Sequence, residues 1–268
     1  MKRALFLAAL CACSHARVRG PDLDPVDLAA RIEKAHELPD SLGAEGKAFV
    51  DAPRNGGRYP CQVAVRRPAS LRIAALDPLG NPAAVLVADE QGRFALLDTR
   101  SNVYYRGPAT AENLARLIPA PLRPAELVAF LLGAPPPLPG GVPASAHRSG
   151  DGSVLLLRAP GGVWQEICAG SDLRVERVRR FRGEDLWWSA TLEDHDDKGG
   201  AQMPRLLRFS IPGEKTEVEL TLRDRLIGKP PPSGAFQLGP PPGVRIVELP
   251  EERALPATGG GRRPEQWY

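Results

Sequence analysis

The sequence predicts a mainly β protein of the α+β class, an unclosed antiparallel half-barrel of about 11 strands with an N-terminal helix and two lid helices. Short runs with alternating apolar and polar residues, such as "YPCQVAVRR", lie on both sides of one central break. Helical periodicity occurs only before the first runs and inside the break, which favours one sheet with helices on one face. The 268 residues are 43% hydrophobic, enough for one domain, which we expect at residues 22–249.

The first residues are typical of an export signal. Lys2 and Arg3 precede an apolar run at residues 4–10, which is too short for a membrane helix of about 20 residues. The following "LCACS" resembles a bacterial lipobox, and Cys13 fits it better than Cys11 because a small residue precedes it. We therefore predict a signal peptide at 1–12 and a lipid anchor at Cys13, with acyl chains such as palmitate.

A serine after the anchor implies sorting to the outer membrane. Residues 13–21 are expected to form an irregular tether between the lipid and a domain that faces the periplasm. The alternatives are a plain secretory signal, or a chance apolar start on a cytoplasmic protein.

The first predicted helix begins after Asp24, a good N-cap residue, with Pro25 at its first position. Leu28 and Ile32 recur on one face until Pro39 ends the helix. This apolar stripe is narrow, so the helix should lie on a sheet rather than inside a core.

Two further helices are expected in the central break. Thr110 caps a short helix that runs to Ile118, and Pro124 opens a second helix that runs through Leu132 and ends at Gly133. Both are strongly apolar on one side, as expected for a lid laid across a sheet. The proline-rich stretch after Gly133 is expected to be an irregular crossover.

Eleven strands are counted in the two alternating regions. They lie at 58–67, 70–77, 82–90, 92–98, 102–107, 153–159, 162–170, 173–181, 186–193, 204–211 and 216–227. Residues 250–268 lack periodicity and are predicted to be disordered.

One turn carries a residue that turn chemistry does not explain. Asp77, Pro78 and Gly80 suit a type I turn between two strands, and they leave Leu79 at its tip. Single exposed apolar residues are ordinary, so Leu79 is either incidental or placed to enter an apolar environment.

Catalytic, metal and nucleic-acid motifs are absent from the sequence. There is no nucleophile elbow, phosphate-binding loop or zinc-binding helix, and the four histidines are isolated. The acidic stretch at 193–200 lacks the ligand spacing of a calcium loop and is interpreted as a solvated hairpin tip. The net charge of +3 is scattered. We expect no enzyme activity, no cofactor, no metal and no nucleic-acid partner.

Two cysteines would remain after processing, Cys61 and Cys168, both in predicted strands. In an oxidising compartment they form either a disulfide or two buried free thiols, and spacing does not decide between these.

The interior of the curved sheet would be either packed with side chains or open as an apolar cavity. From alternation and helix face alone, the expected cavity lining is Leu71, Ile73, Val85, Val87, Leu117, Leu127 and Phe130.

The stretch "LDPLGNPAAVLVADEQGRFALLD…VYYRGPATAENLARLIPAPLRPAELVAFLLGAPP" and the later "QMPRLLRFSI…TEVELTLRD" resemble the LolB/LolA-like family of the Lol pathway. The resemblance implies an unclosed β-barrel with a helical lid over an apolar cavity. It also implies that the chain receives lipoprotein acyl chains from a periplasmic carrier and delivers them to the outer membrane. Leu79 matches the family's protruding loop leucine, and Cys13 its lipid anchor.

The functional hypothesis is therefore a lipid-anchored outer-membrane lipoprotein that binds acyl chains and helps receive or insert lipoproteins, as a chaperone in protein transport. The alternative is a scaffolding envelope lipoprotein of the same fold, with a closed interior and a protein partner.

Overall fold

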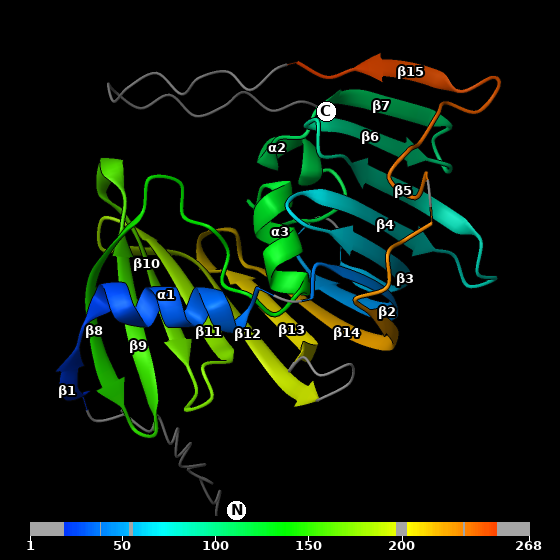
Figure 1. Cartoon of the computed structure of the whole chain (residues 1–268). Coiled ribbons are helices and arrows are strands. Elements are labelled where there is room, and N and C mark those ends of the chain that lie inside the picture. The colour runs from blue at the N-terminus through cyan, green and yellow to red at the C-terminus, as the bar shows by residue number, and fades with distance from the viewer. Residues whose placement is uncertain (1–18, 38, 54–55, 197–202, 233, 251–268) are drawn as a thin grey trace, which may run out of the picture.

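The protein is one open, strongly curved sheet of 15 strands with three α-helices in its described part (Figure 1). The structure is a computed structural model and describes residues 19–250, except 38, 54–55, 197–202 and 233. All neighbouring strands are antiparallel except the last, which pairs in parallel. The mainly β prediction with an N-terminal helix and two lid helices is confirmed. The predicted signal peptide, Cys13 and almost all of the predicted tail lie outside the described residues.

The elements fall into two runs of strands separated by the lid helices. The first part contains β1 (Arg19–Leu23), α1 (Pro25–Ala35), β2 (Ser41–Asp51), β3 (Gly57–Arg66), β4 (Ser70–Leu76), β5 (Pro82–Ala88), β6 (Arg93–Asp98) and β7 (Val103–Pro108). The lid consists of α2 (Ala111–Leu114) and α3 (Pro124–Leu131). The second part contains β8 (Val142–Ser149), β9 (Gly152–Arg158), β10 (Val163–Ala169), β11 (Val175–Arg182), β12 (Asp185–Asp196), β13 (Met203–Ile211), β14 (Thr216–Ile227) and β15 (Arg245–Glu248).

The chain enters the sheet near its middle and fills it in two directions. The strand order is β1-β8-β9-β10-β11-β12-β13-β14-β2-β3-β4-β5-β6-β7-β15. Strands β2 to β7 form one meander, the lid helices cross to the far side, and β8 to β14 return to pair with β2. The lid therefore lies between two halves of one sheet, with α3 at the centre (Figure 1).

The predicted count of 11 strands is wrong, because four strands were not counted. Strand β1 lies partly in the predicted tether, so the sheet includes residues before the predicted domain start at residue 22. Strand β8 lies in the predicted crossover, and β15 lies in a proline-rich stretch. Strand β2 carries Gly46, where a Cβ would stand 2.8 Å from the Thr221 carbonyl oxygen of β14, so the close approach interrupts its pattern.

The helix N-termini follow the predicted caps, whereas α2 ends at Leu114 rather than at the predicted Ile118. The Asp24 carboxylate accepts hydrogen bonds from the Val26 and Asp27 amides at the start of α1, at 2.8 and 3.1 Å. The Thr110 hydroxyl accepts from the Asn113 amide at the start of α2. Gly133 has φ +75° and ends the turn after α3.

The core consists of two apolar clusters on the face of the sheet that carries the helices. The first lies between α3 and strands β2 to β6, and the second between α1, α3 and strands β9 to β13. Three side chains pack against both clusters: Ile118 from the connection between α2 and α3, Leu127 from α3 and Leu207 from β13. The two clusters therefore form one continuous apolar layer beneath the lid.

Candidate functional site

The seam between the lid and the sheet is where the apolar layer meets solvent. Ile118, Leu127 and Leu207, the residues that join the two clusters, are only partly buried. Leu117 beside them is also partly buried against the first cluster. Deeper in, α3 buries Val128 in the first cluster and Phe130 in the second. A ligand that entered at the seam would meet apolar side chains on both sides.

The N-terminal end of α3 is fixed to the sheet by a buried polar network. Glu126 of α3 forms an ion pair with Arg180 of β11, and these two side chains are only 5% and 4% exposed. The guanidinium also donates to the Gln165 side chain at 2.6 and 3.0 Å and to the Pro137 carbonyl at 3.1 Å. The second carboxylate oxygen of Glu126 accepts from the Arg123 amide at 2.7 Å. This network joins the lid, the crossover and two strands.

Aromatic rings surround the same arginine on its apolar side. The Arg180 guanidinium lies over the Trp188 ring, 4.7 Å from its centroid. Phe130 meets Trp188 edge to face at a centroid distance of 5.7 Å, and Phe209 lies 5.3 Å from Trp188. Burial lowers the pKa of Arg180, and Glu126 opposes that shift by stabilising the charged form. The lid is thus held by one desolvated ion pair inside an apolar layer.

Five of the residues predicted to line a cavity lie on the face of the sheet beneath the lid. Leu71, Ile73, Leu117, Leu127 and Phe130 lie in or against the two clusters beneath the lid. Leu71, Ile73 and Leu117 lie in or against the first cluster, Phe130 belongs to the second, and Leu127 packs against both.

Val85 and Val87 were assigned to the wrong face. They point to the outer side of the sheet, where they pack with Ala74, Phe236 and Leu238. Strand register explains the error, because Ile73 pairs with Leu86 across β4 and β5, so Leu86 rather than Val85 shares the inner face.

The turn between β4 and β5 presents Leu79 to solvent, with 86% of the residue exposed. The Asp77 carboxylate accepts hydrogen bonds from the Leu79 and Asn81 amides at 2.9 and 2.8 Å. Gly80 has φ +85°, and its amide donates to the Asp77 carbonyl at 3.0 Å. This is a type I turn followed by a left-handed glycine. These hydrogen bonds lower the pKa of Asp77.

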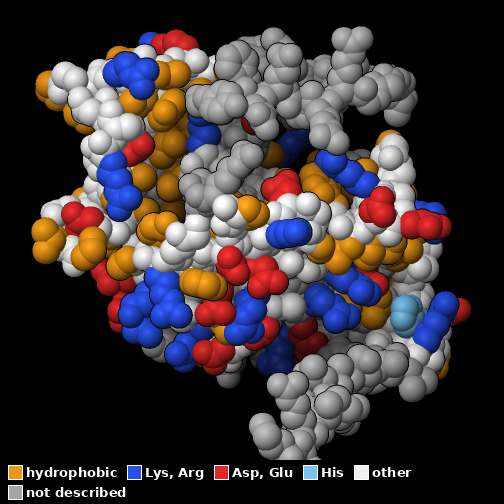
Figure 2. Space-filling view, turned by 180° about the vertical axis from the view of Figure 1, so that it is seen from behind, with side chains coloured by type: hydrophobic (Ala, Val, Ile, Leu, Met, Phe, Trp, Pro, Cys, Tyr) orange, Lys and Arg blue, Asp and Glu red, His pale blue; other side chains and the backbone are white. Residues whose placement is uncertain are grey.

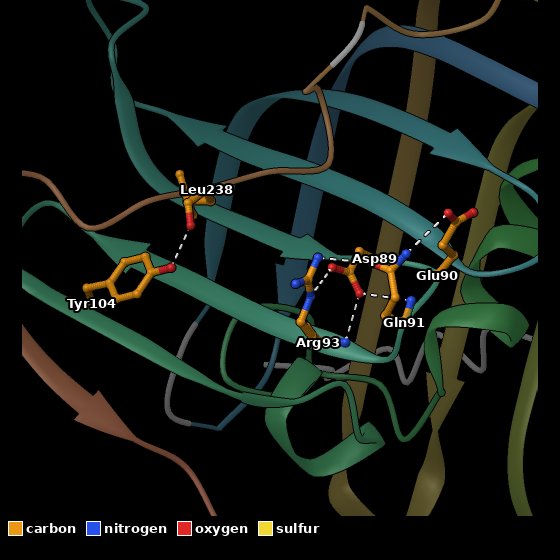
Figure 3. A network of polar contacts seen from close by, with 6 residues as sticks. All are labelled: Asp89, Glu90, Gln91, Arg93, Tyr104 and Leu238. Atoms are coloured by element: carbon orange, nitrogen blue, oxygen red, sulfur yellow. Dashed lines mark hydrogen bonds and ion pairs between the residues drawn. The ribbon is translucent and has the colours of Figure 1, made fainter.

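The next hairpin shows that this turn does not require an apolar residue. In the β5–β6 turn, Asp89 accepts from the Gln91 and Arg93 amides at 3.0 and 2.9 Å, and Gly92 has φ +74° (Figure 3). The two turns have the same backbone pattern, and Gln91 occupies the position of Leu79. Turn geometry therefore leaves Leu79 unexplained.

A polar cavity of about 740 Å³ lies on the opposite face of β8 to β12. It is lined by Arg174, Arg177, Arg179, Glu166 and Cys168, among others. Arg179 forms an ion pair with Glu166 at 2.7 Å, and Arg177 donates to the Cys168 sulfur at 3.4 Å. Lys or Arg side chains alternate with Asp or Glu side chains over the rear of the molecule (Figure 2). Mutual pairing of this kind favours a structural role for these charges.

Several predictions about single side chains can be compared with the structure. Trp188 is buried, and Trp187 packs partly buried against the same second cluster, with the Arg182 guanidinium 3.4 Å from its ring centroid. His36 is buried, and its ring nitrogen lies 2.8 Å from the Ile32 carbonyl oxygen. Glu193 forms an ion pair with Arg208. In the described ranges, no three potential ligand side chains gather as a metal site.

Cys61 and Cys168 are both free and buried, so the disulfide alternative is not formed. Cys61 lies in β3 and Cys168 in β10, and six inter-strand steps separate these strands in the sheet order. At about 4.8 Å per step the path along the sheet is roughly 29 Å, far more than a disulfide spans. Burial raises the pKa of the Cys61 thiol to about 11 and also raises that of Cys168.

Sequence reasoning missed the Glu126–Arg180 pair and the packing of Phe236 on the outer face of the sheet. The pair joins residues that are 54 positions apart, and neither residue stands in a recognisable motif. Arg180 had one local signal, because it alternates with Val178 on the inward face of β11. No helix among the described residues is long and apolar enough to cross a bilayer.

No protein-family model matches the sequence, and no characterised protein matches it. Solved structures do match. A LolA superfamily protein from Nitrosomonas europaea is 14% identical, covers 79% of this chain and 97% of its own, and has a TM-score of 0.56. A Vibrio parahaemolyticus domain described as an outer membrane lipoprotein-sorting protein is 9% identical, with 80% and 96% covered and a TM-score of 0.58.

A DUF1329 family protein from Desulfovibrio piger is 12% identical, with 80% and 98% covered and a TM-score of 0.58. The chain thus has the fold of LolA superfamily proteins over most of its length. The predicted resemblance is confirmed as a resemblance of fold.

Proposed function

We propose, from the premise of this LolA-like fold, that the chain is an envelope lipoprotein that binds acyl chains between its curved sheet and its lid. The continuous apolar layer beneath α3, with its partly exposed seam at Ile118, Leu127 and Leu207, carries the proposal. The activity is binding and transfer rather than catalysis. The export-type N-terminus supports an anchor at Cys13, an outer-membrane location facing the periplasm, and delivery of cargo by a periplasmic carrier.

Acyl-chain binding requires α3 to move away from the sheet. Exposing Val128, Phe130 and Leu131 costs roughly 5–9 kcal/mol at about 1.5–3 kcal/mol for each buried side chain. Leaving Arg180 buried without Glu126 adds up to about 3–5 kcal/mol, because its charge then stays desolvated. Burying one acyl chain of about sixteen carbons returns roughly 12 kcal/mol. The free energy gained by burying one acyl chain is therefore about equal to the cost of opening the lid, whereas burying two chains of one cargo molecule gains more than this cost.

Leu79 supplies an apolar contact for the receiving bilayer in this proposal. It stands outside the apolar layer on a rigid turn, so it can enter a membrane while the lid is still closed. Inserting one leucine gains only about 1.5–3 kcal/mol, enough to orient the protein at a surface but too little to anchor it.

The closed packing supports a second candidate, a scaffolding envelope lipoprotein with a protein partner and no lipid. Its specific observation is the filled aromatic centre formed by Phe130, Trp188 and Phe209 beside the buried ion pair. In that case the lid is a permanent part of the core.

The two candidates differ in whether full-length protein takes up a lipid. A fluorescent diacylated lipopeptide should bind the wild type and remain bound in native mass spectrometry. Ile118→Glu, which places a charge at the seam, should weaken binding at least tenfold. Leu226→Glu is the matched control, because Leu226 is an apolar residue 54% exposed on β14 and outside both clusters. A wild type that binds no lipopeptide would overturn the proposal and favour the scaffold.

A further inference from the structure

The C-terminal part of the fold lies against the outer face of the hairpin that carries Leu79. After β14 the chain passes beside β4 and β5 and then adds β15 to the edge at β7 (Figure 1). We call residues 234–249 the brace. It leads from β14, which pairs with β2, to the hairpin that carries the exposed leucine.

The brace makes a small apolar cluster with the hairpin. Phe236 and Leu238 pack against Ala74 of β4 and against Val85 and Val87 of β5. These three hairpin residues are at most 3% exposed, although they point away from the main core. Without the brace, this apolar surface would face solvent. The brace is thus the reason why β5 is apolar on both faces.

Polar contacts fix the brace at several points along its length. The Tyr104 hydroxyl of β7 donates to the Leu238 carbonyl at 2.5 Å (Figure 3). The Arg72 guanidinium of β4 donates to the Ala235 carbonyl at 3.4 Å. The Arg66 guanidinium lies over the Phe236 ring, 5.4 Å from its centroid. Backbone pairing of β15 with β7 and the Arg106–Glu248 ion pair hold the far end.

Proline limits the freedom of this segment. Three prolines at 230–232 precede it and three at 240–242 stand between Leu238 and β15. Since proline fixes φ near −65°, these stretches lose little conformational entropy when the brace is placed. The brace is therefore built to hold a fixed position against the hairpin.

We infer that the brace, through Phe236 and Leu238, positions the Leu79 turn for contact with a lipid bilayer. A β-hairpin that extends beyond its sheet is flexible when only one face is packed. Strands β4 and β5 pack beneath α3 on the inner face and beneath the brace on the outer face, so the turn between them is clamped from both sides. This inference rests on the proposed role of Leu79 and names the element that supports it.

The test compares Phe236→Ala/Leu238→Ala with Gln237→Ala in full-length protein. Gln237 is exposed and lies between the two apolar residues, so its variant is a matched control. The double variant should speed amide hydrogen exchange in β4 and β5 at least tenfold. It should also slow release of the diacylated lipopeptide to phosphatidylethanolamine and phosphatidylglycerol vesicles at least fivefold, with lipopeptide binding unchanged. The control should match the wild type in all three measurements.

A milder variant keeps the inference testable if the double variant does not fold. Tyr104→Phe removes only the hydroxyl that donates to Leu238, and it should give the same changes with smaller size. Unchanged exchange in both variants, or faster exchange with unchanged release, would overturn the brace inference. If the Leu79→Glu variant instead releases the lipopeptide to vesicles at the wild-type rate, the proposed role of Leu79 is wrong. The failure of the brace inference and the failure of the proposed role of Leu79 therefore give different results.

Discussion

Replacing Glu126 by Gln removes the negative charge that holds the lid to the sheet. The amide keeps the shape of the side chain, but Arg180 is then left with neutral acceptors only, Gln165 and Pro137. Breaking one side of a buried ion pair costs about 3–5 kcal/mol, because the remaining charge stays desolvated. Since two neutral acceptors remain, we expect about 3 kcal/mol. The lid should loosen first, because the pair joins α3 to β11.

Urea and thermal unfolding measure this change directly. For a domain of this size, about 3 kcal/mol corresponds to a fall in Tm of roughly 6–12 °C, at 2–4 °C per kcal/mol. Amide exchange should rise first in α3. The looser lid should also speed uptake of the diacylated lipopeptide, because part of the opening cost has been removed in advance.

A double variant separates the lost pair from lost packing. Glu126→Leu with Arg180→Met removes both charges and fills similar volume, so it should be more stable than Glu126→Gln, although the buried Gln165 oxygen that loses Arg180 keeps it about 1–3 kcal/mol below the wild type. If Glu126→Gln is as stable as the wild type, or if the double variant is as unstable as the single one, the assigned role of the ion pair is wrong.

Other predictions concern the turn and the cysteines. Leu79→Glu should abolish transfer of lipopeptide to vesicles while changing the unfolding free energy by less than about 0.5 kcal/mol, whereas Gln91→Glu in the matching turn should leave transfer intact. The pKa of Asp77 is lowered in the folded state, so its turn should be fully ordered above the ordinary aspartate pKa and should loosen as the pH falls through the lowered value, as seen by NMR of the Asn81 amide. Cys61 and Cys168 should resist iodoacetamide at pH 8 in the native protein and react after unfolding, as peptide mapping by mass spectrometry would show; rapid labelling of native Cys61 would contradict its burial.

Local patterns predicted the helices well because caps and stops act within a few residues. The Asp24 cap, the Thr110 cap and the Gly133 stop are confirmed where the sequence placed them. Strand β3 shows the same success, since Cys61, Val63 and Val65 all face the first cluster. These elements depend on one buried face and one exposed face, which alternation can reveal.

The face of strand β5 that points toward the lid could not be predicted from alternation. Its sequence "PAAVLVA" is apolar on both faces, because α3 covers one and the brace covers the other. Alternation therefore carried no information about direction, and Val85 and Val87 were placed on the lid side. Only the pairing register with β4 decides the face, and register depends on the turn and on neighbours distant in sequence. The Glu126–Arg180 pair could not be predicted either, because it also depends on contacts between residues that are distant in sequence.

The two outermost strands of the described sheet limit edge-to-edge association between copies of the chain. An open sheet of this length offers two unsatisfied edges, and identical molecules held side by side could join through them. Here each edge is a short strand bearing exposed charge. Strand β1 has five residues, with Pro21 and an Arg19–Asp22 ion pair, and β15 has four, with Glu248 paired to Arg106. Such edges are poor templates for another strand, so copies of the chain at high concentration can remain separate.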